Sequence, residues 1–237
     1  MQFAAGAEKT KNFEIIILSP QKKGVQNKMG RTIVIATQKG GVGKPTRASK
    51  LSAALAELGQ KDEAENTIYE LLLAECEIEE CLLETEVENL SIIPANINLA
   101  AAEIELIGID EKEYILKRAL DQIRNRYDFI IIDCPPSLSV LTTNAMCAAN
   151  TVLVPIQCEY YALEGLTQLM YTINLVKERL NPELEMEGVV FTMYDARTNL
   201  SLQVVENVKS NLKQEIYKTI IPRNVRLAEA PSHGMPI

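Results

Sequence analysis

The 237-residue chain lacks the features that mark several large classes of protein. No apolar run approaches the roughly 20 residues that a membrane-spanning helix needs, and the N-terminus lacks the basic, apolar and small-residue regions of a signal peptide. The chain contains only one histidine, and its five cysteines are scattered with no C-x-x-C pair. We therefore expect a cytoplasmic protein with neither a disulfide framework nor a zinc site.

The composition is that of a globular α/β domain, and the charge is unevenly distributed. Apolar residues make up 47% of the chain, enough for one sizeable core, and the net charge of −8 argues against a surface coated with DNA-binding charge. Sixteen acidic residues and a single lysine lie between Asp62 and Glu113, whereas from Tyr194 onward six lysines and arginines outnumber four acids. Any contact with nucleic acid is therefore expected in the C-terminal part.

Residues 32–58, TIVIATQKGGVGKPTRASKLSAALAEL, combine a strand, a glycine-rich loop and a helix. A β-branched run predicts the strand, and apolar residues at helical spacing predict the helix. The loop between them holds three glycines in four positions and then a lysine: Gly40, Gly41, Gly43 and Lys44. Such a loop can point backbone N–H groups and the positive end of the helix at a phosphate chain, while Lys44 reaches the outer phosphates.

This loop resembles the deviant Walker A loop, K-G-G-x-G-K-[ST]-[ST], of the ParA/MinD family of partitioning and positioning ATPases. The resemblance implies the cofactors ATP and Mg²⁺ and a phosphate-binding set consisting of Lys39, Gly40, Gly41, Val42, Gly43, Lys44 and Thr46. It also implies catalytic roles for Lys44 and for Lys39, which matches the signature lysine that reaches across a dimer to the partner's nucleotide.

The loop departs from the family pattern at the residue after Lys44. Pro45 stands where a hydroxyl side chain would bind Mg²⁺ and a backbone N–H would meet the β-phosphate, and proline supplies neither. Proline also disfavours the helical conformation for Lys44, and Thr46 carries its hydroxyl one position too far along. A lost hydrogen bond to a charged group costs about 1.5–3 kcal/mol, or roughly ten- to a hundredfold in nucleotide affinity.

A strand is absent after the predicted helix. Gln60 and Lys61 run directly into the acidic, helix-favouring residues 62–83, where an alternating α/β chain should form its next strand. In ParA-like proteins this slot holds a buried strand followed by D-x-D-P-Q, whose first aspartate orients the attacking water. We therefore expect weak or absent ATP hydrolysis.

We expect a P-loop NTPase fold of the deviant Walker A class: an α/β architecture with a mostly parallel central sheet and helices on both faces, in which one strand and the C-terminal helix are missing. Residues 1–28 are interpreted as an appended N-terminal segment outside the fold, and residues 29–237 as the ParA-like domain. A less favoured alternative is that the apolar run Phe13–Leu18 fills the slot of the absent strand. Further strands are predicted at 90–94, 129–133, 151–156, 188–192 and 217–221, and further helices at 114–126, 163–180 and 201–212.

Asp133 ends a buried apolar strand and begins the sequence DCPPS. A carboxylate at the carboxyl end of such a strand, beside a phosphate loop, is suited to hold a water of a Mg²⁺ shell. The stretch resembles the family's Walker B and second switch. The alternative is an aspartate that caps a turn before Pro135.

Three other stretches resemble family segments, and each leaves a structural alternative open. The resemblance places Met193 and Pro222 near the adenine, and Arg197 and Arg226 on DNA phosphates, where contacts would be salt-sensitive and strong only in a dimer. Any surface arginine can also be merely solvated. The region of Tyr160 and Tyr161 resembles the nucleotide-dependent dimer face, although these tyrosines could equally be core residues.

The resemblance covers Met29–Ile237 and implies a partitioning ATPase that forms an ATP-dependent homodimer and binds DNA without sequence specificity. It further implies a ParB-type partner that stimulates hydrolysis, a nucleoid-associated location and chromosome or plasmid DNA as cargo. The alternative is a degenerate, non-hydrolysing paralogue or fragment that acts only as a DNA- or subunit-binding module. A role in cell-division placement is disfavoured, because the amphipathic membrane helix of MinD-type proteins is not seen.

Overall fold

The computed structural model describes residues 13–19, 30–37, 64–85, 87–135, 139–212 and 215–224. Within these residues the fold is built on an eight-stranded sheet with the order β3-β4-β1-β5-β2-β6-β7-β8. The strands are β1 (Glu14–Leu18), β2 (Arg31–Ile35), β3 (Leu83–Glu84), β4 (Leu90–Ile93), β5 (Phe129–Asp133), β6 (Thr151–Gln157), β7 (Glu185–Tyr194) and β8 (Ile216–Pro222). The helices are α2 (Ile68–Leu72), α3 (Leu99–Glu105), α4 (Ile115–Ile123), α5 (Val140–Ala148), α6 (Ala162–Arg179) and α7 (Asn199–Asn211), with short 3₁₀ turns η2 (Ile78–Cys81), η3 (Lys112–Tyr114) and η4 (Arg124–Arg126).

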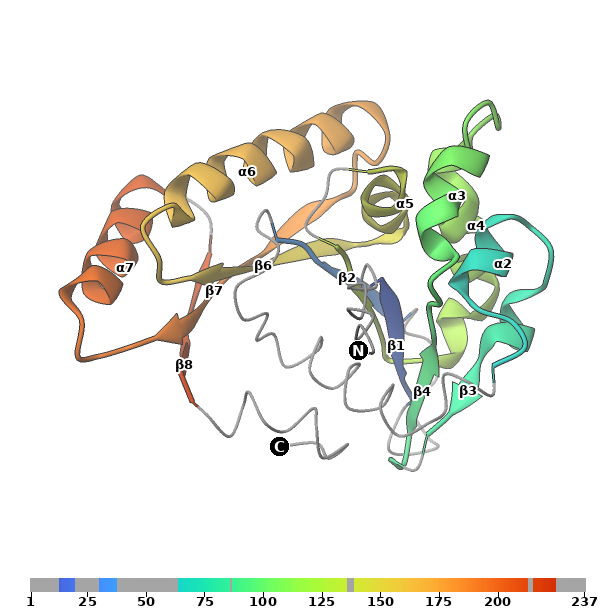
Figure 1. The fold of residues 1–237 in the computed structure, drawn as a ribbon, viewed down its shortest axis with the longest axis horizontal. Coiled ribbons are helices and arrows are strands. Elements are labelled where there is room, and N and C mark those ends of the chain that lie inside the picture. The colour runs from blue at the N-terminus through green and yellow to red at the C-terminus, as the bar shows by residue number, and fades with distance from the viewer. Residues whose placement is uncertain are drawn as a thin grey trace, which may run out of the picture.

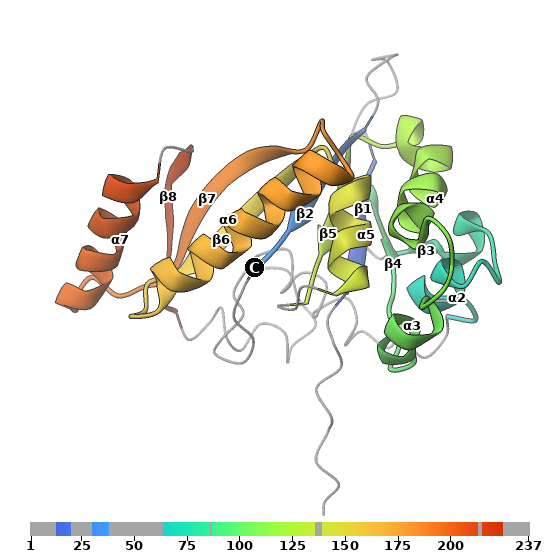
Figure 2. The same cartoon turned by 90° about the horizontal axis from the view of Figure 1, so that it is seen from above.

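The sheet is mostly parallel, and the described helices cover one of its faces (Figures 1 and 2). Strands β2, β5, β6, β7 and β8 form parallel pairs, and β4 runs in the same direction because β1 is antiparallel to both β4 and β5. Strands β1, β5 and β6 are largely continuous apolar runs, a pattern typical of strands inside a parallel sheet. The expected mostly parallel α/β architecture is confirmed.

Strand β1 occupies a place in the sheet that the sequence analysis expected to be empty. Phe13–Leu18 was assigned to a segment outside the fold, but β1 lies between β4 and β5 and pairs with both. Phe13, Ile15, Ile16 and Ile17 are all buried. The physical reason is that β4 and β5 would otherwise leave rows of backbone N–H and C=O groups unpaired inside the protein, and an apolar β-branched run satisfies them. The less favoured alternative for this run is therefore the correct one.

The elements of the second half of the chain agree with their prediction. The strands predicted from residue 90 onward correspond to β4, β5, β6, β7 and β8, and the helices predicted in the same part of the chain correspond to α4, α6 and α7. The helix predicted after the glycine-rich loop lies outside the described residues. Residues 62–83 were expected to favour a helix, but among the described residues of this stretch the α-helix covers only α2, and Ala74 has a positive φ of 58° that no α-helix accommodates. Helices α3 and α5 were not predicted.

Two buried asparagines hold α5 against its neighbours. Asn144 accepts a hydrogen bond from the backbone N–H of Leu116 (3.1 Å), and its Nδ2 donates to the carbonyl of Lys112 (2.7 Å). Asn181 donates from its Nδ2 to the carbonyls of Met146 (2.9 Å), Cys147 (3.3 Å) and Ala149 (3.0 Å). These carbonyls at the C-terminal end of a buried helix have no water to bond, so Asn181 stabilises the point where the chain enters β6.

Candidate functional site

The carboxyl ends of the parallel strands meet along one edge of the sheet, where open α/β sheets bind their ligands. Ile35, at the end of β2, lies opposite Asp133, at the end of β5. The backbone stays in the sheet just past this point, since Cys134 donates its N–H to Ile35 (3.1 Å) and Ala36 donates its N–H to Leu153 on β6 (3.2 Å). The glycine-rich loop therefore follows a strand that ends beside Asp133.

The loop itself lies outside the described residues. Lys39, Gly40, Gly41, Val42, Gly43, Lys44 and Thr46, as well as Pro45, belong to this part of the chain. The roles assigned to them remain predictions. The described structure confirms the strand before the loop and its position in the sheet.

Asp133 lies where the sequence analysis expected a carboxylate. It is only 6% exposed and stands between Ile35 on β2 and Glu14 on β1. The thiol of the next residue, Cys134, is a poor nucleophile. Burial and the neighbouring Asp133 raise its pKa well above the usual value. Glu14 was not among the predicted site residues. Its position at the start of the apolar run Phe13–Leu18 is the sequence feature that could have indicated it.

Met193 and Pro222 come together at the ends of β7 and β8. Tyr194 pairs with Pro222, and the backbone N–H of Arg223 donates to the carbonyl of Tyr194 (2.9 Å). Met193 has a φ of 53°, a left-handed conformation that few non-glycine residues adopt and that is common at functional sites. The structure thus brings the two predicted adenine neighbours to the same edge of the sheet as Asp133, with β2 and β6 between β5 and β7.

Arg197 lies in the turn after β7 and is held by Asp195. Its Nε donates to Oδ1 (2.9 Å) and its Nη2 to Oδ2 (2.7 Å), although its side chain is 88% exposed. These hydrogen bonds from Arg197 hold the pKa of the Asp195 carboxyl well below its usual value. Any anion that binds this guanidinium would therefore compete with Asp195. The Asp-x-Arg spacing in the sequence could have indicated this pair. Arg226 lies outside the described residues.

Tyr160 and Tyr161 project from the turn between β6 and α6. Both are exposed, and their rings meet edge to face with centroids 5.0 Å apart and an interplanar angle of 87°. The alternative that they are core residues is therefore wrong. Two exposed aromatic rings at the carboxyl edge are suited to contact another molecule.

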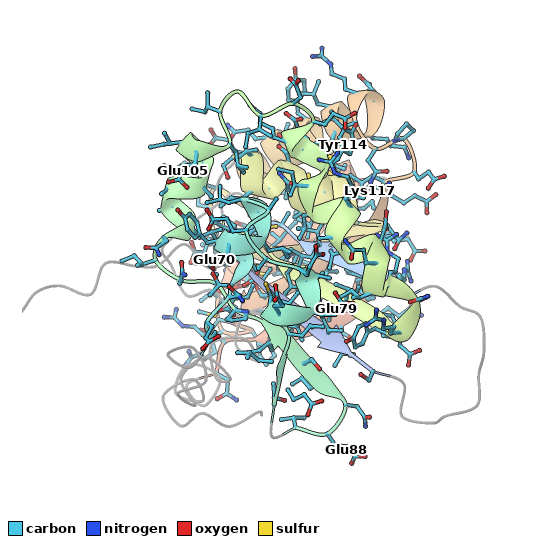
Figure 3. All side chains as sticks on the ribbon, turned by 90° about the vertical axis from the view of Figure 1, so that its right-hand side faces the viewer. Glu70, Glu79, Glu88, Glu105, Tyr114 and Lys117 are labelled. Carbon is cyan, nitrogen blue, oxygen red and sulfur yellow. The ribbon has the colours of Figure 1, made fainter. Side chains whose placement is uncertain are left out.

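The opposite flank of the molecule is acidic. Figure 3 shows Glu70, Glu79, Glu88 and Glu105 projecting from α2, η2, the β3–β4 turn and α3. Such a flank repels a nucleic-acid backbone. This flank is therefore unfavourable for contact with an anionic partner.

The described residues limit the class of site. None of their helices has the length and hydropathy to cross a bilayer. None of their histidine, cysteine, aspartate and glutamate side chains forms a group of three or more that could hold a metal ion by itself. A cation at the carboxyl edge would therefore need ligands from elsewhere, such as the phosphates of a nucleotide.

Known proteins resemble this chain over most of its length. A family model described as an AAA domain matches residues 59–186, more than half of the chain. The sporulation initiation inhibitor protein Soj of Bacillus subtilis is 49% identical over 88% of this chain and 90% of its own length. The chromosome partitioning protein ParA of Myxococcus xanthus is also 49% identical, over 88% of this chain and 81% of its own length.

A solved structure supports the same fold. The cobyrinic acid a,c-diamide synthase of Mycobacterium smegmatis, with bound ATP analogue and magnesium, superimposes with a TM-score of 0.73 and 35% identity, covering 86% of this chain and 93% of that one. The match to the Bacillus protein spans 229 positions, whereas 88% of 237 residues is about 209. About 20 positions of this match therefore have no residue in this chain.

Proposed function

Because the chain belongs to the ParA/Soj family of chromosome-partitioning ATPases, we propose that it binds ATP and Mg²⁺ and acts in the segregation of DNA. In this proposal it forms a homodimer in the ATP state and binds DNA without sequence specificity at the nucleoid. There it interacts with a ParB-type partner protein. The observation that carries the proposal is the buried carboxylate of Asp133 beside the strand that leads into the glycine-rich loop.

The residues at the carboxyl edge suit a nucleotide with its cation. In the proposal, the backbone amides of residues 39–44 and the ammonium group of Lys44 bind the phosphates, and Lys39 reaches the nucleotide of the partner subunit. Asp133 offers the buried oxygen ligand that Mg²⁺ prefers, acting through a water, and Met193 and Pro222 flank the base. Mg²⁺ would neutralise charge on the phosphate oxygens.

We propose that ATP hydrolysis by this protein is weak. Pro45 removes a hydroxyl and an N–H from the phosphate site, and the segment that would carry the water-orienting aspartate is absent. Phosphoryl transfer depends almost entirely on positioning and electrostatics, so losing the group that positions the nucleophile slows turnover even when ATP is bound. DNA-stimulated phosphate release at the rate of an intact family member would contradict this.

DNA binding is proposed to depend on Arg197 and Arg226. Arg197 is exposed but paired with Asp195, so each protomer contributes weakly and a dimer doubles the contacts. Affinity should fall steeply with salt, because such contacts release counterions from the phosphate backbone. A salt series with the protein and its Arg197→Ala variant measures this contribution.

A second candidate function is that of a non-hydrolysing module that binds DNA or pairs with an intact subunit, and Pro45 is the observation that favours it. Nucleotide affinity separates the two candidates. We expect Pro45→Thr to raise ATP affinity roughly ten- to a hundredfold, since it restores the hydroxyl and the N–H. Pro182→Thr, the same change at an exposed turn, serves as the control. Binding by the Pro45→Thr variant with none by the parent protein would favour the module.

A further inference from the structure

Strand β1 places a second carboxylate at the edge of the sheet where the parallel strands have their carboxyl ends. It runs antiparallel to β5, so its first residue, Glu14, lies opposite the last residue of β5, Asp133. The same register continues to Leu18 opposite Phe129 at the other end of the pair. Residues directly opposite each other in an antiparallel pair have Cβ atoms about 4.5–5.5 Å apart. A strand that entered this slot in the parallel direction would have placed its last residue there instead.

The two carboxylates project from the same face of the sheet. Side chains alternate along a strand, and Ile15 and Ile17 of β1 belong to the large core beneath the described helices. Ile16 belongs to a separate cluster with Ile131 of β5 on the other face. Glu14 and Asp133 each lie two residues from a member of that cluster and therefore share its face.

Both side chains are removed from water. Glu14 is 7% exposed and Asp133 is 6% exposed. Carboxylate oxygens are the ligands that Mg²⁺ prefers, and low access to bulk water strengthens their attraction for a cation. Adjacent buried carboxylates at the end of a strand therefore suit a cation that binds at this edge.

We propose that Glu14 and Asp133 together hold the hydration shell of the Mg²⁺ that accompanies the nucleotide. Mg²⁺ keeps several waters and is usually held by one or two carboxylates together with substrate phosphates, so a pair of carboxylates is a fitting protein contribution. The proposal rests on the proposed nucleotide binding. In this proposal, β1 replaces both the missing strand of the sheet and a missing carboxylate of the site.

The test uses Mn²⁺ in place of Mg²⁺, because free Mn²⁺ is counted directly by electron paramagnetic resonance. The full-length protein is titrated with Mn²⁺ at a saturating concentration of a non-hydrolysable ATP analogue. We expect Glu14→Gln to weaken nucleotide-dependent Mn²⁺ binding about tenfold or more, the loss typical of residues that orient metal ligands. Glu178→Gln, the same change at an exposed position on α6, should leave it unchanged.

Thermal unfolding with and without metal separates a cation site from a structural role. Adding Mn²⁺ and the analogue should raise the unfolding temperature of Glu14→Gln less than that of the parent, whereas a purely structural Glu14 would leave this rise unchanged. If Glu14→Gln does not fold, Glu14→Asp serves as the second variant. It keeps the carboxylate but shortens the side chain by one methylene, and it should weaken Mn²⁺ binding severalfold.

Undiminished Mn²⁺ binding by the folded variant would overturn the inference and leave the proposed function standing. No nucleotide-dependent Mn²⁺ binding by the parent would overturn both.

Discussion

Replacing Ile15 with alanine tests the position of β1 in the sheet. Ile15 is fully buried, lies opposite Ile93 on β4 and Ile132 on β5, and packs in the large core. The substitution removes most of a side chain from a packed interior, and core changes of this kind cost about 2–5 kcal/mol. Because the free energy of unfolding of such domains is only about 5–15 kcal/mol, this loss of stability should be readily measurable.

Urea unfolding followed by circular dichroism measures this loss. A cost of about 3 kcal/mol with an m-value of about 2–3 kcal/mol/M lowers the midpoint by about 1–1.5 M. Ile104→Ala is the matched control, since the same atoms are removed from a side chain that is 70% exposed, and its effect should stay within about 0.5 kcal/mol. An Ile15→Ala variant as stable as this control would refute the placement of β1.

Two further predictions concern hydrogen bonds. Asn181→Ala leaves three buried carbonyls at the end of α5 without their donor and should cost about 2–3 kcal/mol in the same urea assay, whereas a loss below about 0.5 kcal/mol would contradict the capping role. Because Arg197 lowers the pKa of the Asp195 carboxyl, their interaction is fully present above the ordinary aspartate pKa and is lost as the pH falls through the lowered one. Carbon-detected NMR titration should therefore place the Asp195 midpoint below about 3.9 and show it rising in Arg197→Ala, and a midpoint that does not move would contradict the pairing.

Local sequence patterns predicted most of the sheet but fewer of the helices. Phe129–Asp133 has its predicted bounds because an unbroken apolar run between polar residues favours a buried strand. Val140–Ala148 gave no helical signal, because α5 is buried on nearly every side and its apolar residues show no 3.6-residue period. The acidic residues after Lys61 favour a helix by composition, but tertiary packing allows only the short α2 and η2.

Site residues at the end of a strand could be predicted from the sequence. Site residues brought together by the pairing of distant strands could not. Asp133 was found because it follows a buried run and precedes a turn-forming sequence. The run Phe13–Leu18 reads as a strand, but nothing local encodes its partners, which lie more than 70 residues away. Glu14 was missed for the same reason, since it meets Asp133 only because β1 runs antiparallel to β5.

Hydrogen exchange of the β1 amides tests most directly whether this strand completes the sheet. The amides of Ile15, Ile16 and Ile17 lie between two partner strands, so they should be among the slowest in the protein to exchange. The amide of Glu84 in β3, at the edge of the sheet, should exchange faster. Exchange of the three isoleucine amides at the rate of an unpaired chain would contradict the account.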